Sequence, residues 1–92
     1  MTEAEFVARH HKAFYSKRWE NRMTQAEVAR KAGISPELVS KLERGVAHPS
    51  LRRTFRIAAA FGMTAAEYVA YVESGEILAF KKIKKNTIRY RY

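Results

Sequence analysis

Residues 24–44 read TQAEVARKAGISPELVSKLER, and this stretch decides the fold. Thr24 and Glu27 have the spacing of a capping box, in which each side chain bonds the other residue's backbone N–H at a helix start. Gly33 stands where that helix would end, because a residue without a Cβ adopts the left-handed conformation of a helix terminus easily. Ser35, followed directly by a proline, marks a second start. The stretch predicts two short helices joined by a tight turn.

The same signals recur along the rest of the chain. Hydroxyl residues that can cap a helix precede each further apolar segment, at Thr2, Ser50 and Thr64, and Thr2 and Thr64 also have a glutamate three residues on. All four glycines fall where a helix would end: Gly33, Gly45, Gly62 and Gly75. The predicted fold class is therefore all-α, with five helices at roughly 3–21, 25–32, 36–44, 51–61 and 65–73.

Apolar residues recur within these segments at helical spacing, which predicts one face of each helix to be buried. We expect Ile34 to point inward with them. The predicted core comprises Phe6, Phe14, Val28, Ala32, Val39, Leu42, Leu51, Phe55, Ile57, Ala58, Phe61, Tyr68 and Val72.

Composition limits the classes of function. A chain of 92 residues forms a single domain, and its formal charge of +9 favours a polyanionic partner. The absence of cysteine excludes disulfide scaffolds and thiolate metal sites. The sequence has no apolar run long enough for a membrane span and no signal peptide pattern, so we expect a cytoplasmic protein without a membrane partner.

Catalysis has no support in the sequence. His10 and His11 are neighbours about 100° apart on a helix and do not readily share one metal ion, and His48 stands alone in a loop. No nucleophile–base pair, paired carboxylates or glycine-rich phosphate loop is recognisable. We expect no enzyme activity, no metal and no cofactor.

Several motifs in register give the chain a family resemblance. They are TQAEVA at 24–29, AGIS at 32–35, VSKLERG at 39–45, Pro49-Ser50-Leu51, Ile57-Ala58 and Phe61-Gly62. Together they resemble the XRE family of phage-repressor-like and Cro-like helix-turn-helix proteins over about residues 14–70. The resemblance implies a lambda-repressor-like fold that binds double-stranded DNA, with the second helix of the motif in the major groove.

Residues early on this recognition helix are the candidates for reading bases. Glu37 can accept from the cytosine amino group, Lys41 can donate to guanine, and Leu38 can pack on a thymine methyl group. Two of these have alternative roles, since Glu37 also suits a helix N-terminus and Leu38 also suits the core. The full set of candidate base contacts is Pro36, Glu37, Leu38, Ser40 and Lys41.

A second set of residues flanks the expected groove, where cations and backbone N–H groups meet phosphates. The resemblance implies that Gln25 bonds a phosphate while it touches the recognition helix. The candidate backbone contacts are Thr24, Gln25, Ser35, Arg44, His48, Ser50, Arg52 and Arg53. The resemblance also implies a structural ion pair, Arg18 with Glu43, between the first helix and the recognition helix.

The expected organisation is a helix-turn-helix domain at 1–75 and a basic C-terminal extension at 76–92, with six basic residues and one acid. TIRYRY alternates in the manner of a strand, so we favour a strand or hairpin that helps to form a dimer. A short sixth helix in the upstream part and a disordered basic tail remain alternatives.

The predicted function is transcription regulation by a homodimer on a palindromic operator, as a repressor of phage, plasmid or restriction-system type. An antitoxin that also binds a toxin protein is the alternative. RNA binding and attachment to a membrane surface are weaker interpretations. Aromatic pairs suited to base stacking are not evident outside Tyr90 and Tyr92, and the segment EILAFKKIKK is too short for a membrane-surface helix.

Overall fold

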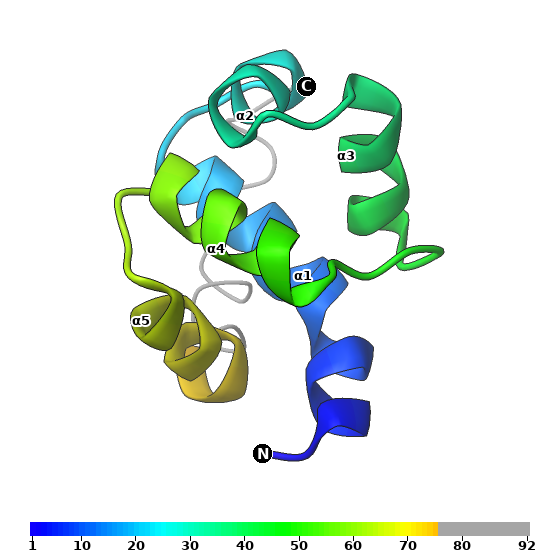
Figure 1. Ribbon diagram of the computed structural model, residues 1–92, viewed down its shortest axis with the longest axis vertical. Helices are drawn as coiled ribbons and strands as arrows, with labels where there is room; N and C mark the ends of the chain where they lie inside the picture. Colours follow the sequence, from blue (N-terminus) through cyan, green and yellow to red (C-terminus); the bar gives the residue numbers. More distant parts are fainter. Residues whose placement is uncertain (76–92) are drawn as a thin grey trace, which may run out of the picture.

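The computed structural model describes residues 1–75, and every residue described in regular structure is helical (Figure 1). The helices are α1 (Glu3–Glu20), α2 (Gln25–Ala32), α3 (Pro36–Arg44), α4 (Leu51–Ala60) and α5 (Ala65–Ala70), followed by a π-helical turn η1 (Tyr71–Gly75). The all-α class is confirmed, and α1 to α4 agree with the predicted ranges to within one residue. The fifth predicted helix changes to π geometry after Ala70. The strand and dimer predictions for 76–92 lie outside the described residues.

Helix boundaries follow the capping chemistry expected from the sequence. The Thr24 hydroxyl accepts from the Glu27 N–H at 3.1 Å and the Glu27 carboxylate accepts from the Thr24 N–H at 2.7 Å; Thr2 and Thr64 form the same reciprocal box. The bond from the Thr24 backbone lowers the pKa of Glu27. Gly33, with φ 68°, ends α2 in the left-handed conformation. Local chemistry therefore fixes where each helix begins.

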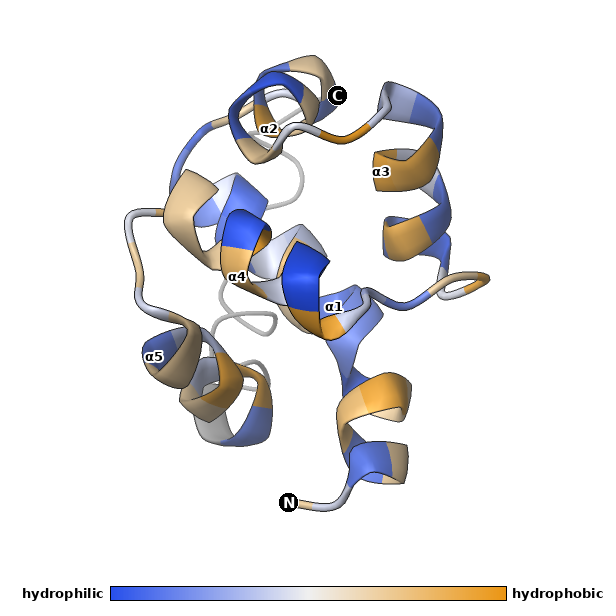
Figure 2. Cartoon of the chain, viewed as in Figure 1, coloured by the Kyte–Doolittle hydropathy of each residue, from blue (hydrophilic) through white to orange (hydrophobic). Residues whose placement is uncertain are grey.

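The helices enclose one core (Figure 1). α2 packs on α3 and α4, α1 on α3 and η1, and α4 on α5. The hydropathy colouring shows α3 with its apolar residues toward α2 and α4 and its polar residues outward (Figure 2). Fully buried large side chains include Phe14, Val28, Val39, Leu42, Ile57, Tyr68 and Val72. This packing holds α3 by one side and leaves its other side in solvent.

The prediction that Leu51 and Phe55 belong to the core is wrong. Leu51 and Phe55 are 76% and 57% exposed. The inner face of α4 is formed by Thr54, Ile57 and Ala58, and at about 100° per residue Leu51 and Phe55 fall on its flank. Thr54 is buried at little cost because its hydroxyl donates to the Ser50 carbonyl at 2.8 Å. Phe6 and Ile34 are half-buried against the core.

A buried polar pair links α1 to α5. His10 Nε2 lies 2.7 Å from Tyr68 Oη, and both side chains are buried. Burial, reinforced by the charges of His11 and His48, lowers the pKa of His10 to about 3. Burial also raises the pKa of Tyr68 well above its usual value. Both groups are therefore neutral near pH 7, and His10 is part of the core.

This burial predicts that stability falls as pH falls below about 6.5. Between pH 6.5 and 3 the unfolded chain binds a proton at His10 that the folded chain does not, so the unfolding free energy decreases by up to about 1.4 kcal/mol per pH unit. We expect a loss of about 2 kcal/mol between pH 7 and 5 in urea titrations. His10→Phe should flatten this dependence, whereas His11→Gln should retain it. A wild-type protein equally stable at pH 7 and 5 would contradict the prediction.

Candidate nucleic-acid interface

Turns at both ends of α3 fix where the helix begins and ends. Gly33 and Gly45 both adopt positive φ, and the Ser35 hydroxyl accepts from the Leu38 N–H at 3.0 Å. A side chain at either glycine would strain the backbone, since L residues rarely occupy this region. Val39 and Leu42 are the buried residues of α3. The helix is thus anchored along one narrow stripe.

The candidate base contacts on α3 differ in how far their side chains are exposed. Pro36, Glu37 and Lys41 are exposed, whereas Ser40 is half-buried. Leu38 is also half-buried and packs against the core cluster, so its alternative core role is realised in part. Base contact by these side chains stays a prediction, and Glu37 and Lys41 have the most accessible polar groups among them.

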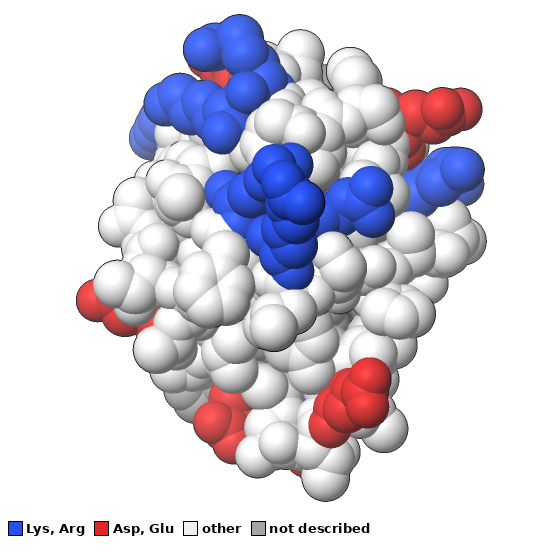
Figure 3. All heavy atoms as spheres, viewed as in Figure 1, with Lys and Arg blue, Asp and Glu red and all other residues white. Residues whose placement is uncertain are grey.

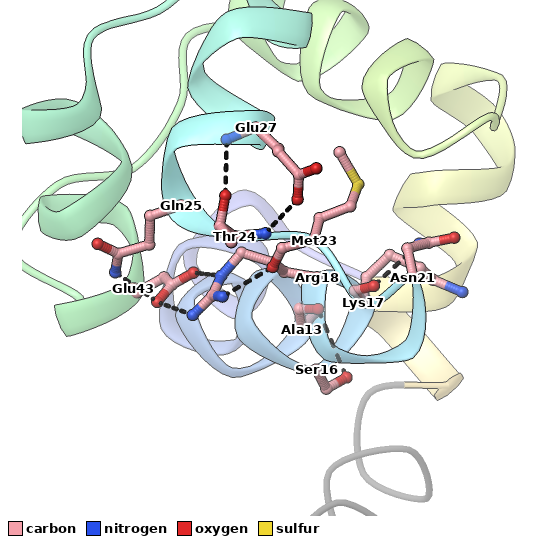
Figure 4. Close-up of polar contacts among 10 residues, drawn as sticks. All are labelled: Ala13, Ser16, Lys17, Arg18, Asn21, Met23, Thr24, Gln25, Glu27 and Glu43. Carbon is pink, nitrogen blue, oxygen red and sulfur yellow. Dashed lines mark hydrogen bonds and ion pairs between the residues drawn. The ribbon is translucent and has the colours of Figure 1, made fainter. Parts of the chain in front are cut away.

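A buried ion pair joins α1 to the end of α3 (Figure 4). Arg18 donates through Nε to Glu43 Oε2 and through Nη2 to Glu43 Oε1 at 2.9 Å. The two side chains are only 3% and 7% exposed. Arg18 Nη1 also donates to the Met23 carbonyl at 2.9 Å. The structure therefore contains the ion pair that the resemblance implied, in a two-point geometry that fixes orientation as well as distance.

Gln25 extends this network to the start of α2. Its Nε2 donates to Glu43 Oε1 at 3.0 Å, so the side chain touches the recognition helix as expected (Figure 4). Its phosphate contact stays a prediction.

The capping hydroxyls among the candidate backbone contacts are already engaged. Those of Thr24, Ser35 and Ser50 accept from the N–H groups of Glu27, Leu38 and Arg53. The Thr24 N–H itself donates to Glu27, so a phosphate there has to share or displace this bond. The exposed cations therefore have more accessible polar groups for a phosphate than these hydroxyls have.

Basic side chains gather on the face of the molecule that Figure 3 shows. Lys and Arg form a band there that runs over α2 and α4 toward α3, and glutamates lie at the outline and on the lower part of the view. The exposed basic residues of these helices are Arg30, Lys31, Lys41, Arg44, Arg52, Arg53 and Arg56. His48 is exposed in the loop between α3 and α4. This band provides the positive surface that a polyanion requires.

Arg56 is a candidate that sequence reasoning missed. Its Nη1 lies 4.0 Å from the position that a Cβ on Gly33 would occupy, so its guanidinium reaches the turn between α2 and α3. The signal was its spacing, since Arg56 follows Arg52 and Arg53 by four and three residues and so projects from the same side of the helix.

The ion pair leads to a stability prediction. Arg18→Met leaves the Glu43 carboxylate buried without its cation, so we expect the unfolding free energy to fall by about 3 to 5 kcal/mol. Replacing both partners, as Arg18→Met with Glu43→Leu, should recover much of the loss. Arg30→Met, at an exposed arginine, should change stability by no more than about 0.5 kcal/mol. Urea denaturation measures all three, and an Arg18→Met variant as stable as the wild type would overturn the assignment.

Comparison with known proteins supports the geometry. A helix-turn-helix family model matches residues 16–69, which span the anchoring part of α1, the two helices of the motif, α4 and most of α5. No curated protein and no solved structure matches the chain. No helix within residues 1–75 combines the length and apolar character needed to cross a membrane. With its turn, its buried ion pair and its exposed second helix in this arrangement, the chain belongs to the XRE/Cro-like helix-turn-helix family of DNA-binding transcription regulators.

Proposed function

We propose that this regulator is a homodimeric repressor that binds a palindromic operator with α3 of each copy in the major groove. The observation that supports this most directly is the outward face of α3, which offers exposed Glu37 and Lys41 beside a band of cations. Glu37 accepts from cytosine N4, and Lys41 donates to guanine O6 and N7. Adjacent turns of one helix thus offer an acceptor and a donor, so the site discriminates between bases.

The cations of α3 and α4 position this helix on the duplex. Arg44, Arg52 and Arg53, with His48 in the intervening loop, bind phosphates beside the groove, and Arg56 adds a contact at the turn. These contacts carry no sequence information, and they make binding strongly dependent on salt. Gln25 completes the set where α2 begins, because its amide bridges Glu43 and the nearest phosphate.

Dimerisation follows from the length of the recognition helix. Helix α3 has nine residues, and its exposed part spans too few base pairs to select one site in a genome. Two copies related by a two-fold axis read two half-sites and hold them in a fixed relation. Repression follows because a dimer bound at a promoter blocks polymerase without a further activating surface. The antitoxin alternative rests on the small size of the chain and its appended C-terminal segment, and no contact among residues 1–75 favours it.

Substitution separates base reading from backbone binding. Lys41→Ala should relax the preference at one position of each half-site, at a cost on the order of 1 to 3 kcal/mol. Arg52→Ala should weaken binding to all sequences alike and lower the salt slope by about one. Titration of operator and random DNA at several salt concentrations measures both effects. If Lys41→Ala weakened both DNAs equally, Lys41 would be a phosphate ligand.

Selection from a random pool of duplex DNA tests the proposed function as a whole. We expect enriched sites with two inverted half-sites whose centres lie about 10 base pairs, one helical turn, apart. Footprinting at physiological salt should show protection of both halves. A single unpaired half-site would contradict the dimer, and failure to enrich any sequence would contradict specific DNA binding.

A further inference from the structure

Ser40 and Arg44 are hydrogen-bonded to each other along α3. Arg44 Nε donates to the Ser40 hydroxyl at 3.3 Å, across one turn of the helix. Arg44 is exposed and is the last residue of α3, whereas Ser40 is half-buried. The short serine side chain has little conformational freedom compared with the long arginine side chain. The bond therefore gives the guanidinium group a fixed point of attachment on the recognition helix.

The charges around Arg44 favour this conformation. The neighbouring Glu43 carboxylate is buried and is bonded by Arg18. Lys41, three residues earlier on α3, carries the same charge as Arg44 and repels the guanidinium. No ion pair within the described part of the chain includes Arg44. The Ser40 hydroxyl is thus the acceptor that the surroundings leave to this side chain.

The atom that Ser40 binds determines which donors remain for a ligand. A guanidinium has five N–H donors in one rigid plane, one on Nε and four on the two Nη atoms. The bond to Ser40 uses the Nε donor and leaves both Nη groups of Arg44. Two parallel N–H groups at the tip of an arginine can bind two oxygens of one phosphate. With Nε held, the free protein already presents this two-point donor.

We propose that Ser40 is a positioning residue, which orients Arg44 toward a DNA phosphate and does not itself contact a base. This inference rests on the proposed function, in which Arg44 is a phosphate ligand. An arginine that is free in solution loses conformational entropy when a phosphate immobilises it. A side chain that is oriented before DNA arrives loses less, so binding is tighter. Ser40 therefore raises DNA affinity through the arginine.

A double-mutant cycle on the full chain tests this role. Ser40→Ala should weaken binding about three- to tenfold, for a selected operator and for duplex of random sequence alike. The salt slope should stay unchanged, because no charge is removed. Arg44→Ala should weaken binding to both DNAs and lower the salt slope by about one. Adding Ser40→Ala to Arg44→Ala should change affinity less than twofold, since the serine then has no arginine to orient.

Two controls separate this role from damage to the fold. Ser40→Thr keeps the hydroxyl and should bind DNA within twofold of the wild type. Alanine favours a helix more than serine does, so Ser40→Ala should not lower the thermal midpoint measured by circular dichroism.

The possible outcomes distinguish this inference from the proposed function. Equal losses when Ser40→Ala is added to the wild type and to Arg44→Ala overturn the inference alone. A Ser40→Ala effect confined to one base position of the operator does so too, because Ser40 is then a base contact. If Arg44→Ala binds both DNAs as tightly as the wild type, the phosphate role of Arg44 in the proposed function fails, and the inference fails with it.

Discussion

The orientation of the recognition helix depends on the buried pair between Arg18 and Glu43. Helix α3 is nine residues long and has two buried side chains, Val39 and Leu42, with Leu38 half-buried beside them, so few apolar contacts hold it. The guanidinium holds both oxygens of the Glu43 carboxylate and the Met23 carbonyl at once. Burying two charges is costly unless every polar atom finds a partner, and here α1, the following loop, α2 and α3 all contribute to the set. The pair defines one arrangement of these four elements.

Most of the fold could be predicted from the sequence, because each helix begins and ends at residues whose local hydrogen bonds and backbone conformation determine the boundary. A threonine with a glutamate three residues on specifies a helix start through bonds made within one turn, and the three capping boxes formed as expected. The ion pair could be expected only through the family resemblance, since Arg18 and Glu43 are 25 residues apart and nothing local links them.

The predictions were wrong where contacts between distant helices determine which side of a helix is buried. Helical spacing shows that Leu51 and Phe55 share a side of α4, but which side faces the core depends on the other helices, and buried Thr54 lies there instead. The spacing of Arg56 from Arg52 and Arg53 places it on their side of α4, but its position at the turn between α2 and α3 follows from the packing of α4 on α2. The change to π geometry after Ala70 had no sequence signal that we recognised. Position relative to distant elements is the part of the site that local patterns cannot give.

The division between buried support and exposed candidate base contacts has a consequence for which residues of α3 can change. Pro36, Glu37 and Lys41 are exposed, whereas the residues that orient α3 lie beneath it. Surface substitutions away from caps and buried partners usually alter stability by less than about 0.5 kcal/mol. Exchanges at Glu37 and Lys41 that keep the charge suited to their helix end, acidic in the first turn and basic in the last, are therefore nearly free of folding constraint. The accessible side chains of α3 and the buried residues that hold it in place are therefore largely separate parts of the same short helix.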